Sequence, residues 1–225
     1  MRSTALRPVA LLLFLGVLVL GRPAPCAAQP GLTLESDTLT QSVLIHPPVA
    51  TGEDQALNTR EHTYRPPLRL GDQLARDFTV TQITDDGVPR PYAPGTEGAA
   101  NADWYGWRQD VLAPFDGTVV QTAAPDTTNP PGTMNLEAQP GVILFQDESG
   151  VSVVYAHVRE IRVSKGDTVA AGEVVAKVGN NGNSRAPHVH IGAWTGGPSQ
   201  GGQKTGGTPL QIQVDLYAEE RGADE

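Results

Sequence analysis

The feature that most restricts the fold is a series of short β-type runs, rich in valine and isoleucine, that begins after residue 68. Turn-forming residues separate the runs, several runs alternate apolar with polar residues, and none has a helical period. The runs are RDFTVTQI, DVLAP, GTVVQTA, GVILFQ, VSVVYAHV, DTVAAGEVVAKVG, HVHIGAW and LQIQVDLYA. We therefore expect a mainly β fold, a single compact antiparallel sheet or half-barrel domain with long loops.

The connections between the runs are of two kinds. The sequence DESG, between Gln146 and Val151, is typical of a tight hairpin turn. The stretches 85–103, 123–139 and 195–209 are longer and rich in glycine, proline or asparagine. Loops of this length in a compact β domain either border a binding site or lack fixed structure.

The N-terminal residues do not fit the β pattern. Residues 1–28 have arginines before a short apolar run and small residues after it, which is typical of a secretory signal peptide and too short for a membrane span. We expect export across the inner membrane to a periplasmic or extracellular location, with no transmembrane segment after cleavage. An uncleaved anchor and lipidation at Cys26 are the alternatives. Residues 29–67 are interpreted as an N-terminal arm with one strand, SVLIH, and 68–220 as the core domain.

Composition excludes several classes of function. The formal net charge is −9, and loss of the three signal-peptide arginines makes the chain still more acidic, which argues against nucleic acid or anionic lipid as a partner. Cys26 is the only cysteine and would leave with the signal peptide. The mature chain would then have no disulfide and no thiolate ligand, so nitrogen and oxygen must hold any metal.

Three of the five histidines lie in the last third of the chain. His188 and His190 are one residue apart in PHVH, so in a strand their side chains project from the same face. His157 ends the run VSVVYAHV about thirty residues earlier. On their own these histidines fit a metal site, a catalytic pair or a solvated surface.

The histidines belong to a longer succession of motifs. The chain contains VLAPFDGTVV, then YAHV, then VSKGDTVAAGEVVAKVGNNGNS, then PHVH, within residues 77–194. This succession resembles the lysostaphin/LytM-type zinc metallopeptidase family in motif order and spacing. The resemblance implies a secreted zinc metalloendopeptidase that hydrolyses peptide bonds in bacterial cell-wall peptidoglycan, with Zn²⁺ as cofactor and peptidoglycan peptide as substrate.

The same resemblance implies a division of roles. His190 corresponds to a metal ligand, and His157 and His188 correspond to two catalytic histidines that flank the metal-bound water. A zinc hydrolase needs three protein ligands and one open position, and zinc lowers the pKa of a bound water to about 7. Neighbouring histidines can accept a proton from that water and stabilise the oxyanion.

The upstream ligands depart from the family pattern, which is His-x-x-x-Asp. In DQLARDFTV, Asp77 stands at the place of the aspartate ligand, but Gln73 replaces the histidine, and a neutral amide is a poor zinc ligand. Family members with an inserted loop resemble this chain, which has an insertion over 85–107, and carry their histidine further upstream. We therefore expect His62 to be the remaining ligand; Gln73, Asp103 or no third ligand are the alternatives.

Two other functions stay open. A degenerate relative would keep the fold and bind peptidoglycan or regulate a cell-wall amidase or other hydrolase, which the incomplete ligand pair favours. The hairpin sequences also resemble biotinyl and lipoyl carrier domains, but Lys177 is not flanked by the usual methionine and DESG offers no lysine.

Two further segments border the expected site. Trp104 and Trp107, in WYGW, fit either the wall of a substrate groove or a plug that pins the insertion. For GNNGNS, residues 179–184, we expect a structural role in which glycines adopt positive φ angles.

Overall fold

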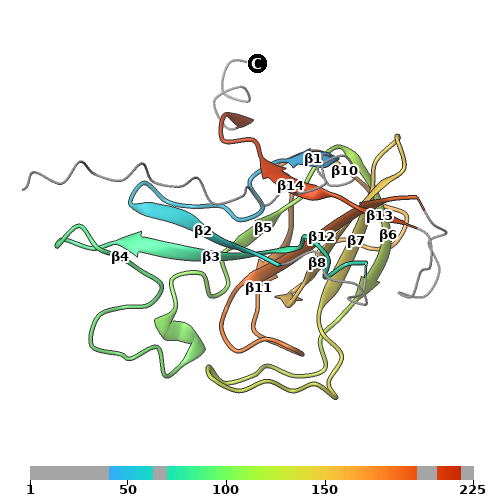
Figure 1. Ribbon diagram of the computed structural model, residues 1–225. Helices are drawn as coiled ribbons and strands as arrows, with labels where there is room; N and C mark the ends of the chain where they lie inside the picture. Colours follow the sequence, from blue (N-terminus) through green and yellow to red (C-terminus); the bar gives the residue numbers. More distant parts are fainter. Residues whose placement is uncertain (1–40, 63–69, 197–206, 219–225) are drawn as a thin grey trace, which may run out of the picture. The chain divides into compact units, whose positions relative to one another are not determined.

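The computed structural model describes residues 41–62, 70–196 and 207–218, which all belong to one compact unit, Ser36–Glu225 (Figure 1). Strands dominate these residues, and η2 (Asn101–Asp103) is a short 3₁₀ helix. The predicted mainly β fold is confirmed. No helix among the described residues is long and apolar enough to cross a membrane. The expected signal peptide lies outside the described residues.

The main sheet has nine strands, and every pair in it is antiparallel. Seven strands follow one another in the order β10 (Thr168–Val169), β6 (Gly117–Ala123), β7 (Val142–Gln146), β8 (Val151–Ala156), β12 (Val189–Thr195), β3 (Arg76–Ile83) and β2 (Gln55–Glu61). In addition, β13 (Thr208–Pro209) pairs with β12, and β4 (Pro89–Arg90) pairs with β3.

Two smaller sheets complete the unit. One has the order β5 (Asp110–Leu112), β11 (Val174–Val178) and β9 (Val158–Arg159). The other pairs β1 (Ser42–Ile45) with β14 (Gln211–Val214), and this pair is parallel.

A single apolar cluster joins the three sheets. The alternation of apolar residues along β6, β7, β8 and β12 sends one set of side chains inward, where they are removed from water. Fully buried members include Val119, Ile143, Phe145, Tyr155 and Ile191 from the main sheet, Val111 and Ala176 from the three-stranded sheet, and Ile212 from β14. The Phe145 and Tyr155 rings meet edge to face, with centroids 5.2 Å apart.

The segment interpreted as an arm contributes more structure than expected. Besides β1, which matches the predicted strand, it supplies β2, which pairs with β3 over its full length. The sequence of β2 is QALNTRE, in which Leu57 is the only apolar residue larger than alanine. Its last four residues are exposed. A polar edge strand of this kind carries almost no alternation signal, because only one of its edges and little of its surface are covered.

The register of β12 between its two neighbours determines where the site forms. His190 lies opposite Asp77 of β3 on one side and opposite Ala156 of β8 on the other. Because β8 ends at Ala156, the next residue, His157, is delivered to the same place. The β2–β3 register ends with Glu61 opposite Arg76, so His62 follows directly beside the start of β3.

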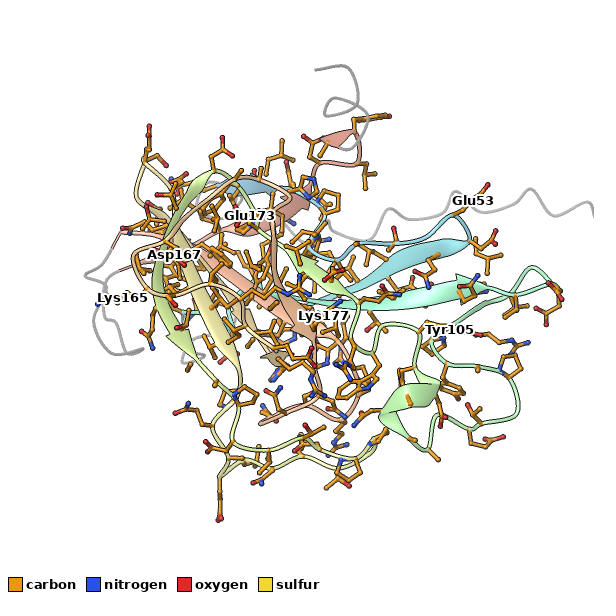
Figure 2. All side chains as sticks on the ribbon, turned by 180° about the vertical axis from the view of Figure 1, so that it is seen from behind. Glu53, Tyr105, Lys165, Asp167, Glu173 and Lys177 are labelled. Atoms are coloured by element: carbon orange, nitrogen blue, oxygen red, sulfur yellow. The ribbon has the colours of Figure 1, made fainter. Side chains whose placement is uncertain are left out.

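The insertion, residues 85–107, and the turn around β10, residues 165–173, lie at different places in the unit. In Figure 2, Tyr105 of the insertion lies on one side of the fold, and Lys165, Asp167 and Glu173, around β10, lie on the other. The turn around β10 therefore lies at a distance from Tyr105 of the insertion.

Candidate metal centre

Asp77 and His190 form the centre of the site, across the β3–β12 pair. Nδ1 of His190 lies 3.0 Å from Oδ1 of Asp77, and His190 is only 8% exposed. Side chains that lie directly opposite each other in an antiparallel pair have neighbouring Cβ atoms, so this contact follows from the register. The fold thus brings together Asp77 and His190, both of which were expected to be metal ligands.

His62 joins this pair from the end of β2. Its backbone N–H donates to the carbonyl oxygen of Ala75 over 2.7 Å, which fixes the residue beside β3. Its Nε2 lies 3.0 Å from Oδ2 of Asp77, and its ring centroid lies 5.0 Å from that of His190. His62 and Asp77 are 15 positions apart in sequence, and the antiparallel pairing of β2 with β3 brings them together.

These three residues fit a zinc ion. One ligand atom from each of His62, Asp77 and His190 lies within 4.8 Å of the others. Tetrahedral zinc with bonds of about 2.1 Å places its ligand atoms about 3.4 Å apart, so small side-chain adjustments suffice. Two imidazoles and a carboxylate are also a donor set that zinc hydrolases use, with one coordination position left open.

The hydrogen bonds of His190 indicate which of its nitrogens would face a metal. Nε2 lies 3.1 Å from the carbonyl oxygen of Gly71, which can only accept, so Nε2 carries the proton. In the neutral ring, Nδ1 then presents a lone pair toward the Asp77 carboxylate, an arrangement that either a cation or a second ring proton must stabilise. Burial alone would lower the pKa of His190, but the hydrogen bond and the charge of Asp77 outweigh it and raise that pKa.

Asp77 stays ionised in this setting. Burial raises its pKa, but hydrogen bonds from His190 and His62, together with the charges of His188 and His190, outweigh burial and hold the pKa well below the usual 3.8. An ionised carboxylate is the form that binds a metal.

His157 lies in a bend between β8 and β9. Its φ angle is 65°, uncommon for a residue other than glycine, and it is 7% exposed. The ring's Nδ1–H donates to the carbonyl oxygen of Asn181 over 2.9 Å, while the Asn181 amide donates to the carbonyl oxygens of His157 and Val158. A side chain at Gly179 would place its Cβ 2.4 Å from the His157 carbonyl oxygen, so glycine is needed there. The asparagine-glycine turn therefore shapes this bend.

His188 faces the same site from the start of β12. Its Nδ1 lies 2.8 Å from the carbonyl oxygen of Ala186, its Nε2 lies 3.6 Å from Oδ1 of Asp77, and its ring centroid lies 4.9 Å from that of His157. Because both His157 and His188 use Nδ1–H to reach backbone carbonyls, their neutral rings keep a lone pair on Nε2.

Burial keeps these two histidines neutral. It lowers the pKa of His157 to about 3, with help from His188 and His190, and it also lowers the pKa of His188. Near neutral pH both rings are therefore proton acceptors.

Other candidates from the sequence have different surroundings. Asp103 lies in η2, where its Oδ2 accepts from the backbone N–H of Ala100 over 2.7 Å, and it is not in the three-residue group. Gln73 lies in the turn that precedes β3 and is not needed to reach three donors. Lys177 lies within β11, away from any turn, with Nζ 2.9 Å from Oδ1 of Asp110 (Figure 2), which does not suit a carrier-domain lysine.

The two tryptophans of WYGW do different things. The Trp104 indole N–H donates to the carbonyl oxygen of Gly98 over 3.0 Å, and its ring meets Tyr92 edge to face at 5.2 Å. Trp104 thus holds separate parts of the insertion together. Trp107 packs under the guanidinium of Arg159, 4.7 Å from the ring centroid, in a cation–π contact.

Comparison with known proteins shows a family likeness for the part of the chain that carries three of the site histidines. A His/Asp/His group that could hold a metal, beside two buried histidines, has the donor set that zinc hydrolases use. The model of peptidase family M23 matches residues 103–201, which include His157, His188 and His190. This match agrees with the lysostaphin/LytM-type resemblance of the motifs, and the peptidases of family M23 are zinc-dependent. His62 and Asp77 lie upstream of the matched residues.

Solved structures give more distant likenesses. The catalytic domain of a mutant of the prophage-encoded M23 protein EnpA from Enterococcus faecalis is 21% identical, covers 70% of this chain and 92% of its own, and has a TM-score of 0.41. The catalytic domain of the antimicrobial peptidase lysostaphin from Staphylococcus simulans is 19% identical, with coverages of 66% and 87% and a TM-score of 0.39. The deep-sea M23 metalloprotease pseudoalterin is 15% identical, with coverages of 72% and 75% and a TM-score of 0.42.

Proposed function

We propose that this protein is a secreted zinc metalloendopeptidase that hydrolyses peptide bonds in bacterial cell-wall peptidoglycan. The observation that carries the proposal is the division of four histidines around Asp77. His62 and His190 make up a three-donor group with Asp77, and Nε2 of His188 lies 3.6 Å from that aspartate. The His157 ring, whose Nδ1 is also bonded to a backbone carbonyl, lies beside His188 and His190 with centroids 4.9 and 5.9 Å away. A site used only to bind metal for stability would be closed by a fourth protein ligand, whereas a hydrolytic site keeps one position open.

The residues supply complementary parts of a peptide-bond hydrolysis. Zinc, when bound, polarises the scissile carbonyl and lowers the pKa of water to about 7. His188, whose Nε2 is 3.6 Å from Asp77, accepts the proton that the attacking water loses. A ring that has taken up a proton is a donor at Nε2, so it can stabilise the oxyanion or deliver that proton to the leaving amine. His157, 4.9 Å away between ring centroids, is placed to share these roles.

The substrate class and the location come from the family and from the N-terminal sequence. Peptidase family M23 acts on peptidoglycan, and residues 1–28 have the composition of a signal peptide. We propose that the mature chain works in the periplasm or outside the cell, on peptidoglycan peptides, with a cell-wall amidase or other hydrolase as a candidate partner.

Zinc content and cell-wall lysis together test this proposal. The full chain is purified without added metal, its zinc content is measured, and it is added to a suspension of purified cell walls. We expect one zinc ion per chain and a loss of turbidity that a chelator stops and zinc restores. Failure to bind zinc tightly would overturn the proposal in favour of a non-catalytic relative that binds peptidoglycan or regulates another hydrolase.

A further inference from the structure

A group of buried polar side chains lies behind the site, on the turn that precedes β12. Asn180 and Ser184 are 0% and 1% exposed, and Asn129, from the loop 123–139, is 3% exposed. Burial of amides and hydroxyls is costly unless each finds a partner, so an arrangement of this kind must be specific. Its hydrogen bonds extend from the insertion to His188.

The direction of the first hydrogen bonds is fixed by one backbone carbonyl. The Asn129 carbonyl oxygen can only accept, and it receives Nδ2 of Asn101 at 2.7 Å and Nδ2 of Asn180 at 3.2 Å. Nδ2 of Asn180 also donates to Oδ1 of Asn101 over 2.9 Å. Asn101 lies in η2, so the insertion is bonded directly to the turn.

The remaining hydrogen bonds connect Asn180 to His188, and their donors and acceptors follow from the same reasoning. Since Nδ2 of Asn180 donates, its Oδ1 accepts, and the Ser184 hydroxyl donates either to this Oδ1 over 2.7 Å or to the Ala186 carbonyl oxygen over 2.9 Å. A hydroxyl has one proton, so Oγ of Ser184 faces Nδ1 of His188, 3.2 Å away, as an acceptor. Nδ1–H of His188 therefore has two acceptors, Ser184 Oγ and the Ala186 carbonyl oxygen at 2.8 Å.

We propose that Ser184, Asn180 and Asn101 are positioning residues for His188. The Ala186 carbonyl oxygen alone is enough to keep the proton on Nδ1 of His188. A single acceptor lets the ring rotate about that hydrogen bond, whereas two acceptors fix the plane of the ring. The network then holds Nε2 toward Asp77, and the insertion acts as part of the catalytic support. Outer hydrogen-bond partners of metal-ligating histidines change metal affinity or activity about 10–100-fold when removed, and we expect an effect on activity of that order for His188. The inference rests on the proposed function only for the role of His188 as proton acceptor.

Nitrogen NMR of the zinc-loaded full chain, labelled with ¹⁵N-histidine, tests the positioning without requiring activity. The His188 signals are assigned by their loss in His188→Gln. We expect the Nδ1–H tautomer in the wild type, a clear change of the His188 nitrogen shifts in Ser184→Ala and Asn101→Ala, and wild-type shifts in Ser184→Thr, which keeps the hydroxyl. Ser149→Ala and Asn135→Ala are matched controls in exposed loops. Unchanged His188 shifts in both Ser184→Ala and Asn101→Ala would overturn the proposal.

Kinetics on a soluble peptidoglycan peptide add a second readout. In Ser184→Ala and Asn101→Ala we expect kcat to fall by about 10-fold while KM, zinc content and Tm stay near the wild-type values, and Ser184→Thr to recover most of kcat. A fall in zinc content that accounts for the whole loss would contradict a positioning role. A wild type without hydrolytic activity would overturn the proposed function, while the NMR result would still decide the inference about His188.

Discussion

Replacement of His62 by alanine is the sharpest test of the metal centre, because His62 is the proposed ligand that the His-x-x-x-Asp pattern of the family does not supply. Its Nε2 lies 3.0 Å from Oδ2 of Asp77, and its side chain is 30% exposed, at the end of an edge strand. A residue this exposed packs against little of the core, so we expect the fold to survive the change. The Asp77–His190 pair stays in place because the β3–β12 register holds it.

The expected size of the effect follows from the number of donors. Apparent zinc-binding free energies of about 10–16 kcal/mol, shared among four ligands, correspond to about 3 kcal/mol per ligand. Loss of one ligand should therefore weaken zinc binding on the order of 100-fold. With His62 absent, only two protein donors of the group remain.

Competition with a chromogenic chelator, followed by calorimetry, measures the zinc affinity of His62→Ala against the wild type. Gln73→Ala should bind zinc as the wild type does, because Gln73 is not required for three donors. His46→Ala is a matched histidine control, since His46 lies against Gly172, outside the metal group. Zinc affinity unchanged in His62→Ala and reduced in Gln73→Ala would refute the assignment of His62.

Three further tests concern the two non-ligand histidines, the pH dependence of stability and the buried Tyr155 hydroxyl. His188→Ala and His157→Ala should keep zinc yet lose about 100-fold or more in hydrolysis rate, measured on a soluble peptide; loss of zinc instead would assign them as ligands. In the folded, metal-free protein burial lowers the pKa of His157 to about 3, whereas in the unfolded chain its pKa is the usual 6.5. As the pH falls below 6.5, the unfolded state therefore binds more protons than the folded state. From His157 alone, the free energy of unfolding should drop by about 2 kcal/mol between about pH 7 and pH 5. The raised pKa of His190 acts in the opposite direction. A urea midpoint that rises on acidification would contradict the prediction. Tyr155→Phe should leave stability unchanged or raise it by about 1–3 kcal/mol, because the Tyr155 hydroxyl is buried and has no hydrogen-bond partner among the described residues; a lower Tm would reveal a partner.

The strands of the core could be predicted closely because burial leaves a period in the sequence. RDFTVTQI and GTVVQTA coincide with β3 and β6, and the DESG turn joins β7 to β8 as expected. The edge strand β2 could not be predicted, since it is polar and its place depends on backbone pairing with β3. The parallel pairing of β1 with β14 likewise depends on residues far apart in sequence.

The site residues could be named from the sequence only through the succession of motifs that resembles the lysostaphin/LytM-type family, because on their own the histidines also fit a solvated surface. Their supporting residues were harder to find. GNNGNS was expected to be a turn with positive φ angles, and Gly182 does have a φ of 59°. The carbonyl and amide of Asn181, however, hold His157, and Ser184 contacts His188. Roles of this type depend on which atoms meet in three dimensions, and a turn sequence gives no sign of them.

Hydrolysis of peptidoglycan by this site is measured by the appearance of new amino groups when the zinc-loaded full chain acts on purified peptidoglycan. Hydrolysis of a peptide bond releases one amine and one carboxylate per bond, so a labelled-amine assay with mass spectrometry of the fragments identifies the reaction. We predict new amino termini that are absent with chelator and with His188→Ala and return when zinc is restored. Stoichiometric zinc in a folded protein that releases no new amino group from peptidoglycan would contradict the account.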